Sequence, residues 1–83
     1  MRATNYGRAF RLARQLAGEG DGRLRTQRAF AARLHVRAEH VSRIENGATL
    51  PSLDLLERAA EVAGVSPVRM MQWAVDGIAG TGT

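Results

Sequence analysis

The stretch TQRAFAARLHVRAEHVSRIENG, residues 26–47, constrains the fold of this chain more than any other part of it. It reads as two short amphipathic helices joined by a tight turn and followed by a sharp stop. The expected inward positions are Phe30, Ala31 and Leu34 in the first helix and Val41 and Ile44 in the second. Isolated helices shorter than about 12–15 residues are marginal in water, so the two must pack against each other and against further helices.

The second helix of this pair leaves a row of small and polar side chains pointing outward. The row consists of Ala38, Glu39, Ser42, Arg43 and Asn46, with His40 at its border. A rigid ridge of this composition suits the DNA major groove, where base edges offer hydrogen-bond donors and acceptors. The outer face of the second helix is therefore a candidate surface for reading nucleic acid.

The charge of the chain is concentrated around the helix pair. Residues 1–47 hold ten arginines against four acidic residues, a net charge of +6, whereas residues 48–83 carry −2. A surplus of positive charge on one side is the electrostatic footprint expected of a polyanion binder. Taken alone, the charge is equally compatible with a role in solubility.

Size and composition limit the remaining possibilities. Eighty-three residues make one domain, expected to span residues 5–76, with a flexible glycine-rich tail over 77–83. The absence of cysteine excludes disulfides, thiolate zinc sites and cysteine nucleophiles. No apolar run approaches the roughly 20 residues that span a bilayer, and no signal peptide is visible, so a cytoplasmic protein without membrane contact is expected.

Three more helices are expected around the central pair. The first runs from Asn5 to Leu16 or Ala17, with Phe10, Ala13 and Ala17 inward. The glycines of GEGDG, residues 18–22, should then break the helix and form a flexible loop with a basic tip at Arg23 and Arg25. This loop either has no function or contacts DNA phosphates.

The central pair is expected at Thr26 to about Leu34 and at about Arg37 to Glu45 or Asn46, with Gly47 as the stop. The fourth helix should begin after the cap Ser52 and end at Gly64. Its expected core is Leu53, Leu55, Leu56, Ala59, Ala60 and Val62. The fifth should begin at Ser66-Pro67 and continue through Val75. The prediction is an all-α, compact five-helix domain.

The ordered set of motifs resembles the XRE-type helix-turn-helix family of lambda repressor-like and Cro-like DNA-binding domains. The matching features are Thr26-Gln27, Phe30-Ala31, Val36, the run VSRIENG from Val41 to Gly47, and Pro51-Ser52. The resemblance covers Tyr6 to Val75. It implies a lambda repressor-like fold with the helix-turn-helix at the second and third helices.

The resemblance also implies roles for individual residues. Ala38, Glu39, His40 and Arg43 match positions that read base edges, and Gln27, Arg28, Arg37, Ser42 and Asn46 are candidates for contacts to the DNA backbone. Arg43 is the strongest candidate, because a guanidinium can donate two hydrogen bonds to guanine. Three alternatives stay open: Glu39 orients Arg43 through an i,i+4 pair, His40 only covers the helix seam, and Asn46 only ends its helix.

Structural expectations follow from the same comparison. Arg14 and Glu45 should form a partly buried salt bridge between the first and third helices. Two departures from the family pattern concern the turn: His35 stands where glycine is common, and Arg37 stands where relatives favour a serine or threonine cap.

The last helix carries more apolar side chains than one helix easily hides. We expect Met71 in the core and a homodimer interface at Met70, Trp73 and Ala74. The predicted function is a sequence-specific regulator of transcription that binds a pseudo-palindromic site on double-stranded DNA as a homodimer. Small phage Cro-like repressors and restriction–modification controller proteins are regulators of this kind. The alternative is an antitoxin or antiactivator that sequesters a protein partner.

An enzyme is not expected. His35 and His40 do not form a metal site without further ligands, and the sequence shows no nucleophile–base pair and no phosphate-cradling glycine loop. No catalytic residue, metal ligand or cofactor is therefore predicted.

Overall fold

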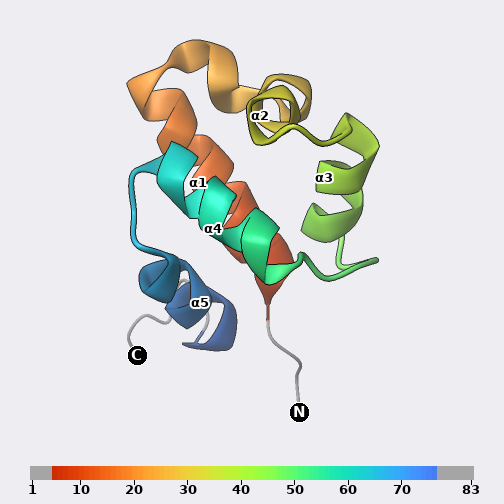
Figure 1. Ribbon diagram of the computed structural model, residues 1–83, viewed down its shortest axis with the longest axis vertical. Coiled ribbons are helices and arrows are strands. Elements are labelled where there is room, and N and C mark those ends of the chain that lie inside the picture. The colour runs from red at the N-terminus through yellow and green to blue at the C-terminus, as the bar shows by residue number, and fades with distance from the viewer. Residues whose placement is uncertain (1–4, 77–83) are drawn as a thin grey trace.

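The computed structural model describes residues 5–76 as five α-helices and one short 3-10 helix (Figure 1). The elements are α1 (Tyr6–Gly20), η1 (Gly22–Arg25), α2 (Gln27–Leu34), α3 (Ala38–Glu45), α4 (Leu53–Ala63) and α5 (Pro67–Asp76). No strand occurs within residues 5–76, so the all-α, five-helix prediction is confirmed. The predicted tail, 77–83, lies outside the described residues. None of the helices within residues 5–76 has the length and apolar composition that a membrane span requires.

Helix α1 is the centre of the domain, and every other element packs against it. Figure 1 shows α4 lying over α1, with α5 below them, α2 above and α3 at the right. The largest fully buried side chains are Phe10, Phe30, Leu34, Ile44, Met70 and Val41. The rings of Phe10 and Phe30 meet edge to face with centroids 6.4 Å apart, which joins α1 to α2.

Side-chain caps place the helix starts where the sequence predicts them. Thr26 accepts from the Ala29 amide, Ser52 from the Leu55 amide and Ser66 from the Arg69 amide, each at 3.1 Å. Gly64 ends α4 with a left-handed φ of 80°. The hydroxyl caps and this glycine therefore fix the boundaries of α2, α4 and α5.

The predicted flexible loop at residues 18–22 is wrong. Helix α1 continues through Gly18 to Gly20, and Asp21 then caps η1 by accepting from the Arg23 amide at 3.1 Å. Gly18 is buried beneath η1, and a Cβ there would lie 2.3 Å from Cγ of Arg25. Here the glycine permits a close approach of two elements instead of ending the helix.

Two apolar positions assigned to the core, Leu53 and Met71, lie on the outside instead, as does Val68 of α5. Leu53 and Val68 are each 63% exposed, and Met71 is 37% exposed. Leu53 and Val68 belong to the first turns of α4 and α5, whose inward positions are filled by Leu55, Leu56 and Met70. The core assignments of Leu53 and Met71 are therefore wrong.

Candidate nucleic-acid interface

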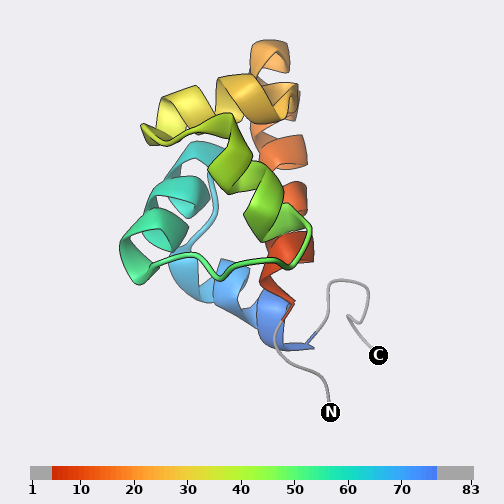
Figure 2. The ribbon, with the colours of Figure 1, turned by 90° about the vertical axis from the view of Figure 1, so that its right-hand side faces the viewer.

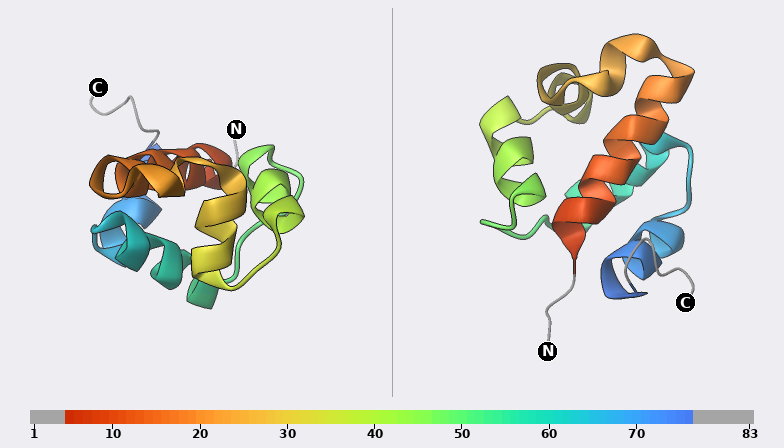
Figure 3. Two further views of the ribbon diagram at one scale, coloured as in Figure 1. Left: turned by 90° about the horizontal axis from the view of Figure 1, so that it is seen from above. Right: turned by 180° about the vertical axis from the view of Figure 1, so that it is seen from behind.

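Helix α3 presents an open outer face at the edge of the domain. Among the elements of residues 5–76, it packs against α1 and α2 alone, and it buries Val41 and Ile44 there. Figures 2 and 3 show α3 standing at one side of the bundle with no other helix over its outer side. The residues left on that side are therefore available to a ligand.

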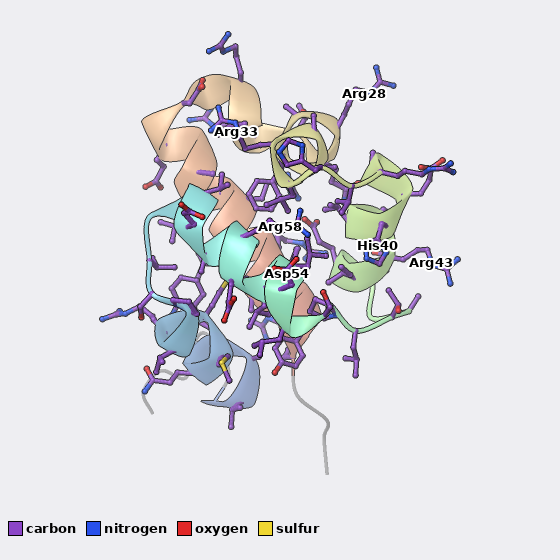
Figure 4. All side chains as sticks on the ribbon, viewed as in Figure 1. Arg28, Arg33, His40, Arg43, Asp54 and Arg58 are labelled. Atoms are coloured by element: carbon purple, nitrogen blue, oxygen red, sulfur yellow. The ribbon has the colours of Figure 1, made fainter. Side chains whose placement is uncertain are left out.

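The predicted reading residues lie on this outer face or at its borders, and Ala38 packs partly against the core. Glu39 and Arg43 are exposed, and Ala38 and His40 are half-buried. In Figure 4 the Arg43 side chain extends away from the body of the protein, and Arg28 projects outward from the neighbouring α2. Among the predicted backbone-contacting residues, Arg28, Arg37 and Asn46 are exposed, whereas Ser42 and Gln27 are half-buried.

Arg43 is not held by the carboxylate four residues earlier. Within residues 5–76, the ion pairs found do not include one between Glu39 and Arg43. The alternative in which Glu39 orients Arg43 therefore has no support in the free protein. Both side chains are left to interact with a ligand.

The C-terminal end of α3 is fixed by a buried carboxylate. Glu45, whose side chain is 1% exposed, accepts from Nε and Nη2 of Arg14 at 2.8 and 2.9 Å. It also accepts from Nε2 of Gln27 at 2.9 Å. Burial acts to raise the pKa of Glu45, but the hydrogen bonds from Arg14 and Gln27 outweigh it, and the pKa lies below its ordinary value.

The predicted Arg14–Glu45 salt bridge is thus present, and together with the hydrogen bond from Gln27 it links three helices. Arg14 comes from α1, Glu45 ends α3 and Gln27 begins α2. The involvement of Gln27 was missed by sequence reasoning, which gave that residue a contact with the DNA backbone. That contact stays a prediction.

Helices α1 and α3 approach each other most closely at Gly7. A Cβ at this position would lie 2.6 Å from the carbonyl oxygen of Glu45 and 2.9 Å from that of Ile44. Glycine is therefore required for the backbones to meet here. Sequence reasoning missed this position because nothing in the local pattern marks it.

The turn between α2 and α3 carries both departures seen in the sequence. His35 adopts the left-handed conformation, with φ 63° and ψ 38°, and is the only non-glycine residue of the described chain with positive φ. Arg37 precedes α3 without a side-chain cap. A further residue, Arg58 of α4, donates from Nη1 to the carbonyl of Leu34 at 2.6 Å, which no sequence signal indicated.

The predicted homodimer interface is wrong for two of its three residues, because they are buried. Met70 is 0% exposed and Ala74 1%, so both belong to the core of the protomer and cannot contact a partner. Trp73 is partly buried against the same core. Within the described part of the chain, the exposed large apolar side chains are Leu50, Leu53, Val68, Met71 and Val75, which we call the outer apolar patch. Leu50, Leu53 and Met71 line one groove together with Tyr6 and Leu56.

Comparison with protein families matches residues 23–69 to the helix-turn-helix family. This span begins in η1, includes α2, α3 and α4, and ends in the first turn of α5. Comparison with curated proteins and with solved structures returns no match. The matched residues thus contain the open face of α3 and the turn that precedes it.

Proposed function

The chain belongs to the XRE-type helix-turn-helix family of DNA-binding regulators, and from this we propose that it binds duplex DNA sequence-specifically as a homodimer and regulates transcription. The observation that carries the proposal is the open outer face of α3, a helix anchored at its far end by Glu45. The helix enters the major groove with this face. Ala38, Glu39, His40 and Arg43 then face the base edges.

Sequence is read chiefly by Arg43 in this proposal. Its exposed guanidinium can donate two parallel hydrogen bonds to O6 and N7 of a guanine, and it has no competing ion pair with Glu39. Glu39 accepts from a cytosine amino group, and Ala38 offers only a methyl group. The docking register is set by contacts to phosphates, which carry little sequence information. Those contacts come from Gln27, Arg28, Arg37, Ser42 and Asn46.

The outer apolar patch is the proposed homodimer interface. Large exposed apolar side chains cluster along α5, where Val68, Met71 and Val75 follow helical spacing, and continue to Leu50 and Leu53 beside the groove. Covering them with a second copy removes apolar area from water. A two-fold dimer requires a pseudo-palindromic site with half-sites about 34 Å apart, one helical turn.

Selection of bound sites from random duplex DNA tests the proposal. The expected product is a pseudo-palindrome, and the affinity for it should fall steeply with salt because phosphate contacts release counterions. A protein that enriches no sequence over bulk competitor DNA at moderate ionic strength would contradict sequence-specific binding.

The dimer is tested separately by sedimentation equilibrium. Met71→Glu places a charge in the outer apolar patch and should yield monomers, whereas the exposed substitution Gln15→Glu on α1 makes the same charge change away from the patch. The alternative function, an antitoxin or antiactivator, uses the same patch for a different protein. A wild-type chain that stays monomeric at high concentration, even on DNA, would favour that alternative.

A further inference from the structure

The carbonyl of Leu34 lies at the point where α2 ends and the turn to α3 begins. The backbone amides of the turn bond elsewhere: His35 donates to Ala32 at 3.1 Å and Val36 donates to Ala31 at 3.0 Å. The Leu34 carbonyl accepts instead from Nη1 of Arg58 at 2.6 Å. A cation at this place also faces the negative end of the α2 dipole.

The Arg58 guanidinium is itself held in place. Its Nη2 donates to Oδ2 of Asp54, one turn earlier on α4, at 2.6 Å. Figure 4 shows Asp54 and Arg58 together on α4. The planar guanidinium of Arg58 thus bridges a carboxylate on α4 and a backbone carbonyl on α2.

The turn that receives this bond keeps two backbone hydrogen bonds but has two unfavourable features. His35 occupies a left-handed conformation that side chains with a Cβ disfavour, and Arg37 gives α3 no side-chain cap. At its other end α3 is fixed by the Glu45 cluster. Within the described elements, α3 packs against α1 and α2 and not against α4. The Arg58–Leu34 bond therefore ties the N-terminal side of α3 to α4 indirectly, through the turn.

We propose that Arg58 is a positioning residue for DNA reading: it fixes the turn, and with it the angle at which the first residues of α3 meet the bases. This inference rests on the proposed function. Hydrogen bonds to base edges depend strongly on distance and angle, whereas attraction to phosphates does not. Loss of Arg58 therefore reduces discrimination between sites more than it reduces non-specific affinity.

The test compares Arg58→Met, which keeps the apolar stem and removes the donors, with Arg58→Lys, which keeps one charged donor. The exposed substitution Arg69→Ala on α5 controls for the lost charge. Two quantities are measured: amide hydrogen exchange of residues 36–41 without DNA, and the ratio of affinities for the selected site and for random duplex. Arg58→Met should speed exchange locally and lower the ratio about tenfold. Arg58→Lys should show smaller changes in the exchange rate and in the affinity ratio than Arg58→Met. Arg69→Ala should leave the exchange rate and the affinity ratio unchanged.

Equal losses on both duplexes would show a merely structural role, because partial unfolding removes binding-competent protein from every site alike. That result, or wild-type exchange and a wild-type ratio in Arg58→Met, would overturn the proposal. Should Arg58→Met fail to fold, Asp54→Ala provides the same test. It removes the carboxylate that holds the Arg58 guanidinium, and Asp54 itself is exposed. If the wild-type protein prefers no duplex, the proposed function fails, while exchange without DNA still shows whether Arg58 fixes the turn.

Discussion

Arg14 and Glu45 lie 31 residues apart in the sequence and form a two-pronged salt bridge that joins the middle of α1 to the end of α3. The Arg14 side chain is 18% exposed and the Glu45 side chain 1%. Arg14 also donates from Nη1 to the carbonyl of Arg25, next to the start of α2. One guanidinium therefore fixes the two helices of the helix-turn-helix against the rest of the domain.

Arg14→Ala is expected to lower the free energy of unfolding by about 3 kcal/mol. Removing one partner of a buried pair leaves an uncompensated charge, which typically costs about 3–5 kcal/mol. We expect the lower end of this range because Glu45 keeps its hydrogen bond from Gln27. Nε of Arg11 also lies 3.8 Å from Oε1 of Glu45 and still offers a positive charge. In a domain of this size, the melting temperature measured by thermal unfolding should fall by more than about 10 °C.

The matched control for this variant is Arg8→Ala. Arg8 is an exposed arginine of the same helix, and its removal makes the same change in net charge. It should change stability by less than about 0.5 kcal/mol. Equal melting temperatures for Arg14→Ala and wild type would show that the salt bridge does not stabilise the fold.

The same carboxylate makes stability depend on pH on the acidic side. The pKa of Glu45 in the folded protein lies below its ordinary value of 4.5: burial would raise it, but the bonds from Arg14 and Gln27 prevail. A lowered folded-state pKa gives stability that is complete above the unfolded pKa and is lost as the pH falls through the folded pKa. The wild-type protein should therefore lose this contribution below about pH 4.5.

Glu45→Gln separates this contribution from those of other carboxyl groups, because glutamine does not titrate. Chemical unfolding of both proteins should give a stability difference that is largest near neutral pH and shrinks as the pH falls. A difference that stays constant between pH 7 and pH 3 would mean that Glu45 has the same pKa in the folded and unfolded chains.

Gly7→Ala and Gly20→Ala should have opposite effects on stability. A Cβ at residue 7 would lie 2.6 Å from the Glu45 carbonyl oxygen, so α1 and α3 must separate. Overpacking of this kind costs about 1–3 kcal/mol. At Gly20, also in α1, a Cβ would meet nothing within 4 Å, and alanine should add about 0.5–1 kcal/mol. Urea unfolding measures both, and a neutral Gly7→Ala would refute the close approach.

The capped starts of the helices and the Arg14–Glu45 pair were predictable from the sequence. Thr26, Ser52 and Ser66 act within three residues of their own position, so local pattern suffices for them. The Arg14–Glu45 pair is distant in sequence, and only the family resemblance indicated it. The departure at His35, which stands where relatives commonly have glycine, was visible in the sequence, and the structure shows this residue in the left-handed conformation.

What the sequence missed depends on contacts between distant elements. Gly18 reads as a helix breaker, yet it stays helical, and its missing side chain leaves the space that Arg25 occupies. Met70 and Met71 are equally apolar, and only packing against the core decides that Met70 is buried and Met71 exposed. Arg58 reads as one half of an ordinary i,i+4 pair with Asp54, and its bond to Leu34 appears only in three dimensions.

Arg43→Ala is expected to relax the preference of the protein at one base position of each half-site. Loss of a bidentate contact to guanine costs about 1–3 kcal/mol of discrimination at that position and leaves the other positions unchanged. Arg28→Ala is the matched control, because Arg28 is an exposed arginine of α2 that projects outward in Figure 4. It should weaken binding to all sequences alike and lower the salt dependence by about one phosphate contact. Titration of both variants against single-base variants of the selected site measures the difference. If Arg43→Ala weakened every sequence by the same factor, Arg43 would be a backbone contact and the reading of bases would fall to Ala38, Glu39 and His40.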